Sequence, residues 1–159
     1  MQQGGIAATG SECVTVLCVS PLEDDHISLE TIFGHTTWML VKADGLAAAY
    51  DILRQHDISV IVSERDLKPG KWTDLLDRIT KLPLHPSMIV TSRLADEHLW
   101  AEALNLGAWD VLAKPFERNE VLRTIEAAWQ HRHEQIKVPV GAVKVREGGK
   151  LRQYAPHLA

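Results

Sequence analysis

The chain has 159 residues, of which 45% are hydrophobic and 24% charged, a composition typical of one compact soluble domain with some chain left over. The charge is unevenly placed. From His131 onward six Lys or Arg stand against two Glu, a net +4, so residues 1–130 carry −8. This acidic body argues against a general nucleic-acid binder, because such proteins present clustered positive charge. This argument does not exclude nucleic-acid binding by the basic tail.

The sequence shows no targeting or membrane segment. No apolar run reaches the roughly 18–20 residues that span a bilayer, and residues 1–13 lack the basic-then-apolar order of a signal peptide. We therefore expect a cytoplasmic protein, no membrane partner, and a flexible N-terminus over 1–13. Cys13 and Cys18 lie five apart in one run, which directs them to opposite faces of a strand. We expect buried, reduced thiols, not a disulfide or a metal pair.

Short apolar runs alternate with amphipathic stretches along the chain. The runs are too continuous for half-exposed strands and predict buried parallel strands at 14–19, 38–41, 58–62, 88–90 and 111–113. Helices are predicted between and after them at about 24–34, 45–55, 72–82, 95–106 and 117–131. Five β-then-α repeats with short links require right-handed crossovers. They predict an α/β, flavodoxin-like doubly wound sheet of order 2-1-3-4-5.

The end signals are clearest in the helix predicted at 95–106. Asp96 and Glu97 suit its positive N-terminal end, and Gly107 supplies a stop. Beyond the helix at 117–131, residues 132–159 have no helical stripe. Gly148-Gly149 lies there between two short alternating segments, so this region is either a hairpin or a disordered tail.

In a sheet of this kind, function collects beyond the carboxyl ends of the strands. The segments to inspect are 20–25, 63–71, 91–95 and 114–116. No GxGxxG motif or P-loop follows the first strand, and no nucleophile elbow is present. These absences count against a nucleotide-binding α/β enzyme. The scattered histidines show no metal-ligand spacing.

The stretches IVTS at 89–92 and LNLGAWDVLAKPF at 104–116 resemble the closing half of a bacterial response-regulator receiver domain of the CheY-like kind. The resemblance covers about residues 14–131. It implies that Thr91 is the hydroxyl that follows a phosphoryl group and that Lys114 is the ammonium that contacts it. It also implies a cis peptide bond between Lys114 and Pro115.

The resemblance implies phosphoryl transfer from a histidine kinase to an aspartate at the end of the third strand, with Mg²⁺ and a Lys neutralising charge. Here Glu64 stands at that position. Anchoring on Pro69 instead would place Arg65 there, and Asp66 would require a shift of two residues. Two interpretations stay open: Glu64 pairs with Lys114 or mimics a phosphorylated aspartate, or Glu64 or Asp66 is itself phosphorylated.

The sequence departs from the family pattern at two further places. Ser20-Pro21 stands where receivers carry two acidic residues after the first strand, so Asp24 and Asp25 are the remaining metal candidates. Their other interpretation is as caps that complement the helix dipole. Val111 stands at the switch position, where the family has Tyr or Phe. Trp109, two residues earlier, is more simply a packing residue.

These departures predict an atypical receiver, a pseudo-receiver without the phosphoacceptor aspartate, acting in two-component phosphorelay signalling as a protein-interaction module and not as an enzyme. Its partner would be a histidine kinase, a downstream protein or a second copy. This partner would bind the face formed by the segments 95–106, 111–113 and 117–131. We expect no resident cofactor unless Asp24 or Asp25 holds Mg²⁺. We expect no effector domain after the receiver, which makes the tail at 132–159 a second expected contact region. The alternatives are a functional phosphoacceptor receiver and a small flavodoxin-like ligand-binding protein or enzyme.

Overall fold

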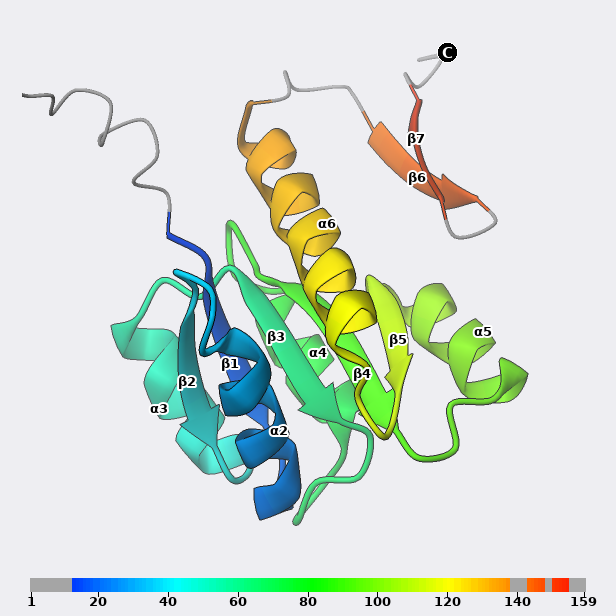
Figure 1. The fold of residues 1–159 in the computed structure, drawn as a ribbon. Coiled ribbons are helices and arrows are strands. Elements are labelled where there is room, and N and C mark those ends of the chain that lie inside the picture. Colours follow the sequence, from blue (N-terminus) through cyan, green and yellow to red (C-terminus); the bar gives the residue numbers. More distant parts are fainter. Residues whose placement is uncertain (1–12, 138–142, 148–149, 155–159) are drawn as a thin grey trace, which may run out of the picture.

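A computed structural model describes residues 13–137, 143–147 and 150–154. Its main sheet has five parallel strands in the order β2-β1-β3-β4-β5, which confirms the predicted flavodoxin-like α/β fold (Figure 1). The strands are β1 (Thr15–Val19), β2 (Met39–Ala43), β3 (Val60–Glu64), β4 (Ser87–Ser92) and β5 (Asp110–Ala113). The helices are α2 (Glu23–Phe33), α3 (Leu46–Gln55), α4 (Trp72–Ile79), α5 (Glu97–Leu106) and α6 (Arg118–Lys137).

Helices cover both faces of the sheet, and each face has its own apolar core. α2 and α6 lie on one face, where Leu29, Phe33 and Ile125 pack against the strands (Figure 1). α3, α4 and α5 lie on the other, where Trp72 is 1% exposed. Continuous apolar strands are required because a sheet covered on both faces buries every side chain. β1, β3 and β4 meet this condition.

The expectation of a buried strand at 38–41 is wrong. β2 occupies the edge of the sheet, and only Ala43 among its residues is buried, whereas Met39 is 56% exposed. An edge strand has a neighbour on one side only, so the helices cover it incompletely. The expectation that both thiols are buried is also wrong: Cys18 is buried, but Cys13 precedes β1 and is exposed.

α6 continues to Lys137, six residues beyond the predicted end at 131. Its last turns are held by contacts that an apolar stripe does not reveal. His131 stacks on Trp109 with ring centroids 4.5 Å apart, and Arg132 Nη2 donates a hydrogen bond of 3.0 Å to Asp57. In the opposite sense, α4 ends at Ile79 and α5 begins at Glu97, so both are shorter than expected.

The C-terminal region contains β6 (Val143–Glu147) and β7 (Lys150–Tyr154), which pair antiparallel with Glu147 opposite Lys150. This antiparallel pairing is the one that the hairpin alternative for this region requires. Gly148-Gly149 and residues 1–12 of the N-terminus expected to be flexible over 1–13 lie outside the described residues. In the part of the chain that the structure covers, no helix is long and apolar enough to cross a membrane.

Candidate functional site

The carboxyl ends of the central strands bring together side chains from distant parts of the sequence. Glu64 is the last residue of β3, Ser20 follows β1, and Lys114 follows β5. The strands are parallel, and β1 and β4 flank β3, so the carboxyl ends of the strands lie side by side along one edge of the sheet. Ser20 is 1% exposed and Glu64 8%, which places polar groups in a region largely closed to water.

Lys114 is the centre of this edge. Its Nζ lies 2.7 Å from Asp25 Oδ2 and also forms an ion pair with Glu64 Oε1. The side chains of Lys114, Asp25 and Glu64 are 7–9% exposed. Charges that are shielded from water interact more strongly than surface charges, so this is a tightly held group. We call Asp25, Glu64 and Lys114 the charged triad.

Neutral donors add hydrogen bonds to both carboxylates of the triad. Ser20 Oγ donates to Asp25 Oδ2 over 2.6 Å, and the backbone N–H of Asp66 donates to Glu64 Oε2 over 3.0 Å. The ring of His26 is buried, and its Nε2 lies 2.9 Å from the carbonyl oxygen of Ser20, the arrangement of an N–H donor. A buried charged group is tolerated when its oxygens are hydrogen-bonded in this way.

The acidic residues predicted near this site separate into three environments. Asp25 points inward to Lys114, which contradicts its interpretation as a helix cap: the N-cap of α2 is Leu22, and no side chain caps it. Asp24 is exposed. Asp66 is 64% exposed at its side chain and pairs with Arg65 over 3.1 Å, a contact that raises the pKa of Arg65.

The other residues expected at the site lie on β4 and β5. Thr91 is opposite Glu64 in the sheet, and its Oγ1 lies 3.5 Å from the Ser63 carbonyl oxygen. Val111, at the expected switch position, is 7% exposed and belongs to the apolar core. The peptide bond between Lys114 and Pro115 is cis.

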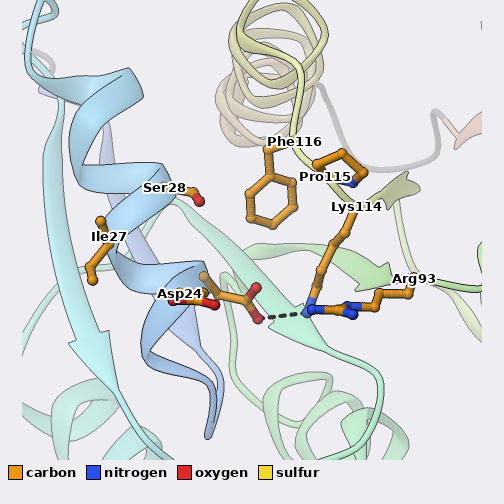
Figure 2. Close-up of a pocket in the computed structure, with 8 residues that line it drawn as sticks. Asp24, Ile27, Ser28, Arg93, Lys114, Pro115 and Phe116 are labelled. Carbon is orange, nitrogen blue, oxygen red and sulfur yellow. Dashed lines mark hydrogen bonds and ion pairs between the residues drawn. The ribbon is translucent and has the colours of Figure 1, made fainter.

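A cavity of about 520 Å³ opens beside the triad, between the first turns of α2 and the connection from β5 to α6 (Figure 2). Ile27 and Ser28 lie on its α2 side, and Lys114 and Phe116 face them. Arg93 adds a second cationic side chain at this opening. Arg93 forms no ion pair with the residues that the structure describes.

The resemblance to receivers implies Mg²⁺ at this edge, and the oxygen atoms present there decide whether the ion fits. Three of the four carboxylate oxygens of Asp25 and Glu64 already accept hydrogen bonds from Lys114, Ser20 or the backbone. Mg²⁺ requires near-octahedral oxygen ligands. Within the described residues, no group of three or more His, Cys, Asp or Glu could hold a metal ion. The residues present therefore do not fit a magnesium ion.

The sequence did not reveal two features of the site. Ser20 was considered only as a missing carboxylate, whereas its hydroxyl hydrogen-bonds to Asp25. Asp25 was not predicted to pair with Lys114, because that contact depends on how α2 rotates over the sheet. The hint available in the sequence was three successive acids at 23–25, only one of which the fold turns inward.

Comparisons with known proteins give a consistent result. A family model described as "Response regulator receiver domain" matches residues 19–126. The transcriptional regulatory protein CutR of Streptomyces coelicolor is 31% identical over 111 residues, and the same match is found in Streptomyces lividans. These matches cover 70% of this chain and 49% of the relative, so the chain spans about half the length of CutR.

Solved structures share the fold. The signal receiver domain of an HD domain-containing protein from Pseudomonas fluorescens superposes with a TM-score of 0.70 at 24% identity, over 77% of this chain and 99% of that one. The beryllofluoride-activated NtrC4 receiver domain dimer gives a TM-score of 0.69 at 24% identity, over 74% and 98%. These likenesses show the shared fold, and the family match over residues 19–126 shows that the chain belongs to the response regulator receiver domain family of two-component signalling.

Proposed function

We propose that this receiver domain is a protein-interaction module whose state is set by the charged triad and not by phosphorylation. The observation that carries the proposal is the ion pair between Glu64 and Lys114. Glu64 stands at the acceptor position. Its carboxylate pairs with the Lys114 ammonium, which would otherwise contact a phosphoryl group. The positive charge of Lys114 is thus compensated without a phosphate.

The chemistry of transfer supports this proposal. An acceptor carboxylate oxygen must attack phosphorus in line with the leaving group, which depends mainly on placement. Both oxygens of Glu64 are engaged, Oε1 by Lys114 and Oε2 by the Asp66 N–H. The extra methylene of Glu moves the carboxylate by about one bond length, and a misplacement of about 1 Å costs roughly a hundredfold in rate.

Asp66 supports the alternative less well. Its side chain lies outside the triad, 64% exposed and paired with Arg65. A phosphoryl group carried there would be solvated and would lack the Lys114 ammonium, which contacts Asp25 and Glu64. If Glu64 or Asp66 is instead a functional acceptor, the phosphorylation test below gives the opposite result.

The test is incubation of the purified protein with MgCl₂ and acetyl phosphate, followed by intact mass spectrometry. Transfer would form an acyl phosphate on a carboxylate and release acetate. We expect no stoichiometric phosphate adduct. An adduct that disappears in Glu64→Ala or in Asp66→Ala would overturn the proposal and identify the acceptor, with Asp24→Ala as a control for a nearby exposed acid.

We further propose a cytoplasmic protein whose partner is a kinase, a downstream signalling protein or a second copy. The face expected for contact includes Leu106 on α5, which is 52% exposed. Among relatives of the same fold, the NtrC4 receiver is described as a dimer. The basic region 132–159 remains a proposed second contact. Self-association is tested by light scattering: Leu106→Glu is expected to weaken a dimer, while Met39→Glu, on the edge strand β2, leaves it unchanged.

A further inference from the structure

We infer that the C-terminal hairpin of β6 and β7 is a binding surface for duplex DNA and that it contacts the DNA through the major groove. The inference names a class of partner for the basic region 132–159, and it rests on the proposal that this region makes a second contact. It does not involve the charged triad or phosphorylation.

The hairpin is an incomplete element on its own. β6 and β7 pair with each other in a two-stranded sheet that is separate from the main sheet (Figure 1). An isolated two-stranded hairpin is at best marginally stable in water, and each of its strands has backbone groups without a neighbouring strand on one side. A partner surface would therefore supply contacts that the hairpin lacks.

The charge of the hairpin narrows the choice of that partner. Its ten strand residues include four Lys or Arg and one Glu, a net +3, whereas residues 1–130 carry −8. The hairpins of two copies would repel each other, and lysine on an edge strand opposes edge-to-edge pairing. Positive charge that is clustered on one element favours the phosphates of a nucleic acid.

The register of the two strands divides these charges between two faces. Residues directly opposite each other share a face, as do residues two apart in one strand. Lys144 is opposite Gln153, and Arg146 is opposite Leu151. Lys144, Arg146 and Gln153 therefore belong to one face. The single acidic residue, Glu147, belongs to the other face, opposite Lys150.

The shape of the hairpin favours DNA among nucleic acids. The major groove of B-form DNA is about 12 Å wide and admits a two-stranded β-ribbon. Lys and Arg bind phosphate oxygens, and Gln forms two hydrogen bonds with adenine, so the face without an acid holds residue types that DNA recognition uses. The major groove of A-form RNA is deep and narrow, and side chains do not read it. A ribbon of this kind therefore fits duplex DNA better than duplex RNA.

The experiment is a titration of a short, fluorescently labelled DNA duplex of mixed sequence with the full chain, followed by anisotropy at several NaCl concentrations. We expect a Kd of roughly 10⁻⁴–10⁻⁶ M at physiological salt and weaker binding to an RNA duplex of the same sequence. With four phosphate contacts, the logarithm of the association constant falls against the logarithm of salt concentration with a slope of about −3.6.

A double variant and a matched control locate the binding surface. Lys144→Gln with Arg146→Gln removes both cations of the face without an acid, and it is expected to weaken binding about tenfold or more and to halve the salt slope. Lys68→Gln with Lys81→Gln removes the same charge from exposed positions of the body. This control is expected to change the Kd by less than about twofold, because its lysines do not contact the DNA.

A third variant keeps the test decisive if the double variant loses the hairpin. Glu147→Gln retains all four cations and is expected to tighten binding. Equal losses in the double variant and its control overturn the inference, as does a wild-type protein without saturable DNA binding. Equal affinity for the RNA duplex, or displacement of the DNA by poly-L-glutamate at equal charge concentration, overturns it as well. A phosphate adduct by mass would overturn the proposed function and would leave the DNA titration unaffected.

Discussion

The Lys114 ammonium lies 2.7 Å from the Asp25 carboxylate, although the two residues are 89 positions apart in the chain. The contact ties the first turn of α2 to the connection between β5 and α6. Since Lys114 also pairs with Glu64 at the end of β3, one side chain joins three segments of the domain. The triad is thus a structural link as well as a candidate signalling site.

Lys114→Ala is expected to lower the free energy of unfolding by about 3–5 kcal/mol, because loss of one partner leaves buried charges uncompensated. Urea denaturation at neutral pH measures the change. Lys42→Ala, which removes an exposed ion pair, should have a much smaller effect. Equal losses in the two variants would mean that the triad is not a buried group in solution.

Only one of the two thiols is expected to react in the folded protein. Burial, with a smaller contribution from Asp25, raises the pKa of Cys18, so its reactive thiolate is suppressed, whereas Cys13 is exposed. A colorimetric disulfide reagent near pH 8 should titrate one thiol in native protein and two in urea. Cys13→Ser should reduce the native count to zero. A native count of two would contradict the burial of Cys18.

The same pKa shift predicts a loss of stability in alkaline solution. Below the ordinary thiol pKa of 9.0, Cys18 is protonated in both the folded and the unfolded chain. Above it, the unfolded chain gains a thiolate that the folded protein excludes, so the free energy of unfolding decreases as pH rises. Cys18→Ala should show a shallower decrease above pH 9.0 in urea denaturation. Parallel profiles would contradict the shift.

Glu117 should stabilise the start of α6 in a pH-dependent manner. Its carboxylate oxygens accept hydrogen bonds from the backbone N–H groups of Asn119 and Glu120, which hold its pKa below the ordinary 4.5. Its contribution is therefore present above pH 4.5 and is lost as the pH falls through the lowered value. Glu117→Ala should lower the unfolding free energy at neutral pH and narrow the difference between neutral and acid stability. An unchanged difference would argue against the capping role.

Arg132 is expected to contribute more to the free energy of unfolding than Asp57, its ion-pair partner. Its side chain is 12% exposed and donates to Asp57 over 3.0 Å and to the Leu84 carbonyl over 3.2 Å, while Asp57 is 86% exposed. Arg132→Ala should destabilise the protein by about 1–3 kcal/mol, because the hydrogen bond to the Leu84 carbonyl and the packing of the Arg132 methylenes are lost. Asp57→Ala should have an effect of at most about 1 kcal/mol. Thermal unfolding of both variants checks the order.

The pattern of apolar runs was sufficient to predict the sheet order, because continuous β-branched segments alternating with helices have few topological solutions. It was not sufficient for β2, whose apolar residues look buried in the sequence although the strand lies at the edge. The end of α6 was also missed. Its last turns depend on ring stacking and on Arg132, and neither contact produces an apolar period.

The site residues also differ in whether the sequence alone could place them. Residues at strand ends, such as Glu64 and Lys114, could be placed from the sequence because a strand and its end are local features. Asp25 and Ser20 could not, since their contacts depend on the packing of α2 over β1 and β5. A neighbour in three dimensions has no fixed spacing in the chain. The resemblance to receivers does not help with Ser20, because this residue stands where receivers carry an acidic one.

The placement of the triad at positions 25, 64 and 114 has a consequence during synthesis on the ribosome. Domains form as the chain emerges, N-terminal parts first. Until residue 114 has left the exit tunnel, the segment already outside holds Asp25 and Glu64 without the ammonium that pairs with both. A premature sheet of β1, β2 and β3 would therefore have to bury two like charges. The closing Lys114 thus favours completion of the native sheet only after its last strand has been made.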